Sequence, residues 1–474
     1  MRVSMKFTVT ILIAALAMSG FALSTGTPAA AGEAMRYVIL GAGSLPVGFD
    51  SLIASIGGRV VARLDEIGAA IVESDEPTFL YAADALPGIA GVAEDVALQI
   101  ESDPVSGIVV EGIDGIAVEG LNPRGAKFFG VQWGLSNVAA DQAWAAGFRG
   151  NPVVKVAILD SGIDITHQEF SNGKVIAALS KSFFPESLPM GAPAYLDVHG
   201  HGSHVAGIIS TNGISFASVA PDVKLIAVKV SGRAGFTTLG TLAQAIVYAA
   251  GVGADVINMS FGSSGLSKDD LRANHLKQVL WLAMNYAHSK GALLVASAGN
   301  LAIDWDGSAF KQLTKFPVQL NHVVGVSATG PFFGDEFDSI GVALTTSGDY
   351  LEYTDYGKSV VDFAAPGGSR TTYLVPFPGM PPAPADWVLS VCARFSSSTC
   401  ASGRAGTFMV GSSMAAAHMS GVAALIDSAY GGRLTGDQIV ALLKKGAEDF
   451  GKPGFDEFYG HGRINVYRSL TLNK

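Results

Sequence analysis

The sequence predicts an α/β fold, a doubly wound parallel sheet with a smaller α+β segment in front of it. From about residue 129 onward, short runs that are apolar on both faces alternate with helical segments, as in a parallel sheet covered by helices on both sides. Apolar residues make up 49% of the chain and charged residues 15%, so the composition supplies a large buried core for such a sheet.

The elements of the main part follow from its hydrophobic pattern. The expected strands are 153–159, 225–230, 256–259 and 293–296. The expected helices are 241–250, 269–288 and 435–445, and Gly446 is well placed to end the last one. In an open parallel sheet, ligands bind beyond the carboxyl ends of the strands, so we expect the active site at that edge.

A compact segment from about residue 35 to residue 100 precedes the main part. Its expected strands are 37–40, 59–62 and 69–73, and its expected helices are 50–56 and 78–85. Gly41 and Gly43 hint at a dinucleotide-binding loop, but Pro46 falls where the helix of such a loop starts. A dinucleotide site is therefore not expected. Residues 102–128, rich in Gly, Pro and Val without clear periodicity, are interpreted as a linker.

The first 31 residues have the layout of a secretory signal peptide. Arg2 and Lys6 precede an apolar run over 7–23, and small residues at 29–31 suit cleavage after Ala31. The alternative is an uncleaved membrane anchor, but the run is borderline in length for spanning a bilayer and a glycine interrupts it. We therefore expect a secreted protein, extracellular or periplasmic, without a membrane anchor after signal removal.

The net charge and the cysteine content bear on nucleic-acid binding and on export. The net charge of −10, with no block of Lys or Arg, argues against nucleic-acid binding. The two cysteines, Cys392 and Cys400, could close a small loop as a disulfide, which suits an exported protein, or could remain free thiols.

Three polar residues follow strand ends or precede helices in the main part. Asp160 ends the expected strand 153–159, His201 lies in a glycine-rich turn that leads into a helix, and Ser413 lies in a turn before a helix of small residues. These are the groups needed to activate a serine. The histidine takes the hydroxyl proton, while the aspartate fixes the histidine tautomer and stabilises the imidazolium that forms.

A fourth residue completes this set. Asn300 follows the expected strand 293–296, and its side-chain amide can donate a hydrogen bond to an oxyanion. The backbone N–H of Ser413, at the positive end of its helix, would be a second donor.

The segments around these residues resemble the signature blocks of the subtilisin-like serine proteases. The blocks are Asp160-Ser-Gly-Ile-Asp164, His201-Gly-Ser-His-Val-Ala-Gly207, Ser297-Ala-Gly-Asn300 and Gly411-Ser-Ser-Met-Ala415. They occur in that family's order, Asp, His, Ser. The resemblance implies a subtilisin-like peptidase catalytic domain over 129–474, closed by 460–466, and an inhibitor-like propeptide over 32–101.

The resemblance also implies an activity. The expected enzyme is a secreted serine endopeptidase that hydrolyses peptide bonds through an acyl-enzyme on Ser413. Its propeptide acts as folding template and intramolecular inhibitor until self-cleavage between Ile100 and Phe129. A monomer is expected.

Two further segments match the family's substrate-binding strands. Ser260-Phe261-Gly262 resembles the strand that borders the primary pocket, and Gly235-Phe-Thr237 resembles the opposing strand. Polypeptide substrates would lie between them in extended form. The alternative is that both segments are ordinary strand ends.

Two departures from the family pattern bear on rate and metal binding. Ala417 stands where the family usually has a proline that stiffens the nucleophile's helix. Residues 210–218 are short where many members carry a calcium-binding loop, although Glu169 stands where those members place an acidic ligand. We expect no required cofactor and leave calcium open.

The remaining histidines allow another interpretation. His199, His201 and His204 suggest a metal cluster, but the sequence has no His-Glu-x-x-His helix, and His204 matches a helix position of the family pattern. His167 and His418 are expected to be hydrogen-bonded structural residues. No metal site is therefore assigned.

Two other functions compete with proteolysis. An esterase of the α/β-hydrolase type also uses Ser, His and Asp, but it needs Gly-x-Ser-x-Gly, and Ala415 stands at the last position. A protease-shaped binding protein without catalysis typically lacks a triad member, and none is missing here.

Overall fold

The computed structural model describes residues 34–99, 105–115, 122–263, 265–330, 339–340, 353–369, 374–375, 383–384 and 386–472. The expected signal peptide, 1–31, lies outside the described residues. None of the helices in the described ranges has the length and hydrophobicity needed to span a bilayer.

The main part is built on a sheet of eight strands, ordered β16-β15-β13-β11-β7-β9-β8, with β17 also paired to β15. All of its strand pairs are parallel except the pair of β15 and β16. The strands are β7 (Lys155–Asp160), β8 (Lys181–Ser182), β9 (Lys224–Lys229), β11 (Val256–Met259), β13 (Leu293–Ser297), β15 (Val323–Gly330), β16 (Ser339–Ile340) and β17 (Phe363–Pro366). The predicted parallel sheet is confirmed.

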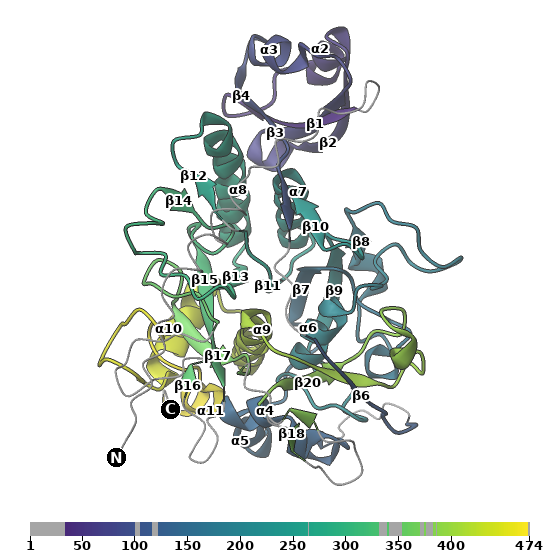
Figure 1. Cartoon of the computed structure of the whole chain (residues 1–474), viewed down its shortest axis with the longest axis vertical. Helices are drawn as coiled ribbons and strands as arrows, with labels where there is room; N and C mark the ends of the chain where they lie inside the picture. The colour runs from purple at the N-terminus through teal and green to yellow at the C-terminus, as the bar shows by residue number, and fades with distance from the viewer. Residues whose placement is uncertain are drawn as a thin grey trace, which may run out of the picture.

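Helices cover both faces of this sheet (Figure 1). On β7, Val156 and Ile158 join a core with α6 (His201–Ile209) and α9 (Ser412–Ala429). Ala157 and Leu159 join a second core with α7 (Leu239–Gly251) and α8 (Leu271–Ser289). The other helices are α4 (Trp133–Asn137), α5 (Ala140–Ala145), α10 (Gly436–Gly446) and α11 (Val466–Thr471). The fold is therefore doubly wound, and Gly446 is the last residue of its helix.

The N-terminal segment forms an α+β unit with an antiparallel sheet ordered β2-β3-β1-β4, drawn in purple in Figure 1. Its elements are β1 (Met35–Gly41), α2 (Phe49–Ser55), β2 (Gly58–Leu64), β3 (Ala69–Ser74), α3 (Phe79–Asp84) and β4 (Ile89–Glu94). On β1, Tyr37 and Ile39 pack with the two helices, whereas Val38 and Leu40 join the core that contains α7 and α8. This unit therefore packs against the main part through one face of its sheet.

The segment interpreted as a linker contains an additional strand. β6 (Val105–Val110) pairs antiparallel with β21 (Gly406–Met409), which pairs in turn with β20 (Val388–Val391). Glu111 and Asp114, which follow β6 in the sequence, form ion pairs with Arg404. β6 was not predicted, because glycine and proline residues nearby obscure its valine-rich run. Whether 102–128 separates two domains stays a prediction.

Short pairs of strands complete the described structure. They are β5 (Ala97–Gln99) with β10 (Phe236–Thr238), β12 (Leu266–Ser267) with β14 (Leu313–Thr314), and β18 (Leu374–Val375) with β19 (Ala383–Pro384). Cys392 and Cys400 form a disulfide with their Cα atoms 5.7 Å apart, so the bridged alternative is the one the structure contains.

Candidate active site

The predicted catalytic residues lie at strand and helix ends of the main part. Asp160 is the last residue of β7, His201 is the first of α6, and Ser413 is the second of α9. The parallel register of β7 and β11 pairs Ile158 with Asn258, and the two strands end close together, two residues later at Asp160 and one residue later at Met259. α6 and α9 pack against each other on one face of the sheet. Asp160 thus lies at the carboxyl edge of the sheet, and His201 and Ser413 lie in the first turns of two helices that pack against each other.

Asp160 and His201 are hydrogen-bonded to each other. Nδ1 of His201 lies 2.9 Å from Oδ1 and 3.0 Å from Oδ2 of Asp160, and both side chains are buried. Oδ1 also accepts the backbone N–H of Ser161 at 2.7 Å. Because a carboxylate only accepts, Nδ1 carries the proton in this bond, and Nε2 is the basic nitrogen.

Gly202 permits this close approach. A Cβ at Gly202 would lie 2.2 Å from the carbonyl oxygen of Gly162 and 3.2 Å from Cβ of Asp160. Any side chain there would push α6 away from β7, so the glycine after His201 has a steric reason.

A buried carboxylate that the sequence analysis missed holds the turn before His201. Asp197 accepts hydrogen bonds from the backbone N–H groups of His199, Gly200 and Ser203 at 2.8–2.9 Å. Burial opposes ionisation of Asp197, but the bonds from Gly200 and Ser203 and the charge of Lys229 outweigh it and lower its pKa. Asp197 is therefore an anion that fixes this turn.

Lys229 also stabilises the turn before His201. Its side chain is fully buried, and its ammonium donates to the carbonyl oxygens of Ser161 and Leu196 at 2.5 and 3.0 Å. It also forms an ion pair with Glu186 at 3.2 Å. A lysine near a strand end gave no recognisable signal in the sequence, because its partners come from two other segments.

Ser413 is tied to the predicted substrate-binding strand. Its Oγ donates to the carbonyl oxygen of Ser260 at 3.0 Å, and Oγ of Ser260 donates to the Ser413 carbonyl oxygen at 2.9 Å. Asn258 links Ser260 to Ser420, further along α9, through bonds of 2.9 and 2.8 Å. The helix α9 and the strand end around Ser260, Phe261 and Gly262 are thus fixed to each other. Phe261 itself is buried.

The amide of Asn300 is oriented by the residue before Ser413. Its Oδ1 accepts from both the backbone N–H and the hydroxyl of Ser412, each at 2.9 Å. The Ser412 hydroxyl oxygen accepts in turn from the N–H of Gly299 at 3.1 Å. Because Oδ1 accepts both of these bonds, the orientation of the amide is fixed, and Nδ2 is its donor end.

The second predicted substrate-binding segment already carries an extended strand. Gly235, with a positive φ of 70°, precedes β10, and β10 pairs antiparallel with β5 of the N-terminal segment. Phe236 pairs with Gln99 and Thr238 with Ala97. This edge can therefore accept an added peptide strand.

The other buried histidines are structural, as expected. His204 bonds to the carbonyl oxygens of Val388 and Thr407 at 3.2 Å, and burial lowers its pKa to about 3 against these bonds. Burial likewise lowers the pKa of His167 and of His418 to about 4, although each bonds to a backbone carbonyl. All three are neutral at physiological pH.

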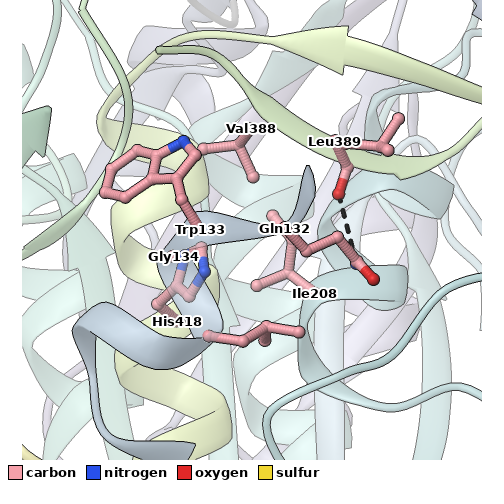
Figure 2. Close-up of a pocket in the computed structure, with 8 residues that line it drawn as sticks. Gln132, Trp133, Gly134, Ile208, Val388, Leu389 and His418 are labelled. Carbon is pink, nitrogen blue, oxygen red and sulfur yellow. Dashed lines mark hydrogen bonds between the residues drawn. The ribbon is translucent and has the colours of Figure 1, made fainter. Parts of the chain in front are cut away.

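A small cavity beside His418 contributes nothing to this site. Its lining residues are Gln132, Trp133, Gly134, Leu135, Ile208, Val388, Leu389 and His418 (Figure 2). None of the four predicted catalytic residues is among them. With a neutral imidazole as the sole titratable group of its lining, the cavity offers no pair of acid and base.

Glu169 does not fit a calcium ligand in this fold. Its carboxylate accepts the backbone N–H groups of Ile214, Ser215 and Phe216 at 3.2, 2.5 and 3.1 Å. A cation would have to compete with these donors for the same oxygens. Within the described ranges, no group of three or more His, Cys, Asp or Glu side chains could hold a metal ion. The other departure from the family pattern, Ala417, is fully buried within α9.

Comparison with known proteins adds independent information. The sequence model of the subtilase family matches residues 152–462. Thermitase from Thermoactinomyces vulgaris is 29% identical over 73% of this chain and 99% of its own. Subtilisin DY from Bacillus licheniformis is 31% identical over 71% of this chain and 97% of its own.

A solved structure supports the fold over nearly the whole chain. The epidermin leader peptide processing serine protease from Staphylococcus aureus superimposes with a TM-score of 0.70. It covers 94% of this chain and 99% of that one at 24% identity. The matched length includes the N-terminal α+β unit as well as the main sheet.

Proposed function

Because this chain belongs to the subtilase family and is a serine endopeptidase acting on polypeptides, we propose that it is an exported enzyme with Ser413 as its nucleophile. Ser413 attacks the scissile carbonyl and forms the acyl-enzyme. His201 takes the hydroxyl proton on Nε2 and returns it to the leaving amine, while Asp160 holds the imidazole and stabilises its charged form. The buried hydrogen bond of 2.9 Å between Asp160 and His201 is the observation that carries this proposal.

We assign the oxyanion hole to Asn300 and the backbone N–H of Ser413. The amide orientation set by Ser412 supports this role, because Oδ1 is engaged by Ser412 and the amide cannot reverse without losing both bonds. Ser413 lies in the first turn of α9, where unpaired N–H groups favour negative charge. Both donors strengthen as the carbonyl oxygen gains charge in the transition state.

We infer that residues 32–101 inhibit the enzyme until it matures by self-cleavage. The pairing of β5 with β10 supports this inference, because it occupies the edge where an extended substrate would add. Asp95 of the N-terminal unit accepts from the N–H of Gly240 in the first turn of α7, at 2.8 Å. Inhibitor and enzyme thus share a strand pairing and a helix-capping contact.

The proposed cleavage lies between Ile100 and Phe129, as the sequence suggests. Within that interval, the pairing of β6 with β21 favours a position before Val105, because a cut after β6 would leave this strand on the propeptide side while its partner β21 stays in the enzyme. The mature enzyme then keeps β6 as its first strand. We propose that it works as a monomer outside the cytoplasm and needs no cofactor.

The Ser413→Ala precursor tests the proposal. In a purified system without other proteases, we expect it to keep residues 32–101 attached and to leave denatured protein substrates intact. Maturation of this variant would contradict self-cleavage. Activity on a peptide amide, compared with a matched ester, separates this function from that of an esterase.

A further inference from the structure

The chain that follows Asn300 is paired with a segment more than fifty residues away. The N–H of Ala302 donates to the carbonyl oxygen of Tyr353 at 2.8 Å, and the N–H of Trp305 donates to that of Tyr356 at 3.0 Å. The N–H of Tyr356 returns a bond of 2.9 Å to Ile303. Asp355 therefore lies in a segment that runs beside the loop that carries Asn300.

The carboxylate of Asp355 gathers four donors in the interior. Its Oδ1 accepts the backbone N–H groups of Leu301 and Ile303 at 2.8 and 3.0 Å. Its Oδ2 accepts the indole N–H of Trp305 at 2.8 Å and the ammonium of Lys315 at 2.6 Å. The side chains of Asp355 and Lys315 are both fully buried.

Both neighbours of Asn300 are thereby fixed to one residue. On one side, the N–H of Asp355 donates to the carbonyl oxygen of Gly299 at 2.9 Å. On the other side, the Asp355 carboxylate accepts from the N–H of Leu301. The backbone of Asn300 is held at both ends, while its side-chain oxygen is held by Ser412.

Gly299 shows how closely the ion pair approaches this loop. A Cβ at Gly299 would lie 2.1 Å from Nζ of Lys315 and 2.4 Å from Oδ2 of Asp355. The residue also has a φ of +118°, where other residues are strained. The peptide before Asn300 therefore rests directly on the charged pair.

A buried ion pair suits this position better than an apolar cluster. The loop presents two backbone N–H groups and an indole N–H to the interior, and each would be unsatisfied against hydrocarbon. A carboxylate accepts all of them at once, and the ammonium of Lys315 balances its charge. Nζ of Lys315 also lies 4.9 Å from the centre of the Trp305 ring, a cation–π distance.

From this arrangement we propose that Asp355, balanced by Lys315, is a positioning residue for the amide of Asn300. It keeps the donor end of the amide aimed at the developing oxyanion, although it does not touch the substrate. The inference rests on the proposed function of Asn300 as an oxyanion donor. Removing such a donor lowers kcat by about 10²–10³, a magnitude measured in a subtilisin and hence in this same family.

A double-mutant cycle tests the proposal. The neutral pair Asp355→Asn with Lys315→Met is introduced with Asn300 and with Asn300→Ala, and each precursor is matured by added wild-type enzyme and purified from it. kcat and KM on a peptide amide are measured per active site, counted with a fluorophosphonate. With Asn300 present, we expect kcat to fall tenfold or more and KM to change less than threefold.

The second background separates positioning from general support. With Asn300→Ala, we expect the neutral pair to lower kcat less than threefold further, because the amide it positions is gone. Equal losses in both backgrounds, or an unchanged kcat with Asn300 present, would overturn the proposal. If Asn300→Ala alone leaves kcat unchanged, the proposed oxyanion role itself is refuted, and this outcome is distinct from the previous two.

Two further variants guard against misinterpretation. Trp305→Phe removes one donor to Asp355 without a change of charge, and we expect a loss of threefold or more in kcat that again disappears with Asn300→Ala. If the neutral pair does not fold, this variant decides the question alone, and an unchanged kcat refutes the proposal. Glu448→Gln, which weakens a partly buried ion pair with Arg463, is the matched control and should leave kcat unchanged.

Discussion

Replacing Asp95 by alanine should weaken inhibition of the mature enzyme by a fragment of residues 32–101 about 30-fold. In the full chain, the buried carboxylate of Asp95 accepts from the Gly240 N–H at 2.8 Å and the Thr238 hydroxyl at 2.7 Å. It also pairs with Arg36 at 3.1 Å. Alanine would leave these donors without their acceptor.

The magnitude follows from the two bonds that cross between the units. A hydrogen bond to a charged group contributes about 1.5–3 kcal/mol, and burial of the carboxylate offsets part of the sum. A net loss of about 2 kcal/mol corresponds to about 30-fold in the inhibition constant. The neighbouring Glu94→Ala is the control. Its contact with Arg272 is 3.8 Å long and largely exposed, so its loss should change the constant less than threefold.

The pH dependence gives a second readout of the same contact. Burial raises the pKa of Asp95 from its ordinary value of 3.8, and the bonds from Thr238 and Gly240 only partly oppose this. The complex therefore binds a proton more readily than the free fragment. The resulting stabilisation is complete below pH 3.8 and is lost as pH rises through the raised pKa. Inhibition should weaken with rising pH, and Asp95→Ala should flatten this trend.

The assay is the inhibition of peptide-amide hydrolysis by the added fragment, at several pH values between 5 and 9. Three results would refute the reasoning. The Asp95→Ala fragment could inhibit as well as the unchanged fragment, the Glu94→Ala fragment could lose as much, or inhibition could tighten with rising pH.

Other predictions follow from the same structure. Asp160→Asn should lower kcat by about 10⁴ with little change in KM, because an amide favours the wrong tautomer of the histidine. This magnitude is the loss known from the same exchange in another serine protease family. A loss under tenfold would contradict the role of Asp160. The mature enzyme should begin before Val105, as N-terminal sequencing would show, and a start within β6 would refute the proposed cleavage position. Burial raises the pKa of Asp427 to about 6. The stability that this residue contributes is therefore lost as pH rises from about 4 to 6. Asp427→Asn should raise Tm at pH 8 but not at pH 4. Glu169→Ala should lower the free energy of unfolding by at least about 2 kcal/mol, because it leaves three backbone N–H groups unsatisfied. A calcium chelator should leave the Tm of the unchanged protein unaltered. A chelator effect that is lost in Glu169→Ala would instead indicate a metal at this residue.

The sequence alone predicted the parts of the fold that depend on local pattern. Apolar runs such as 256–259 correspond to a strand with the same bounds, β11 (Val256–Met259). Asp160, His201 and Ser413 were found because each occurs at a strand or helix end within a short block. Hydrophobic periodicity was sufficient for the strand, and the resemblance of the four blocks to the subtilisin-like proteases indicated the candidate residues.

The residues that hold the site were not predicted, because their partners are distant in sequence. Asp355 contacts the backbone beyond Asn300, and Lys229 contacts Ser161 and Leu196. No local pattern marks a buried charge whose donors come from other segments. β6 was missed for the related reason that its partner, β21, lies almost three hundred residues later.

Labelling of the nucleophile tests the central claim most directly. Mature, folded enzyme is treated with a fluorophosphonate and the modified residue is located by mass spectrometry. We expect one label per molecule, on Ser413, with parallel loss of peptide hydrolysis, and almost no labelling in His201→Ala. A mature enzyme that cleaves peptides but is unlabelled at Ser413, or is labelled at another residue, would contradict the account.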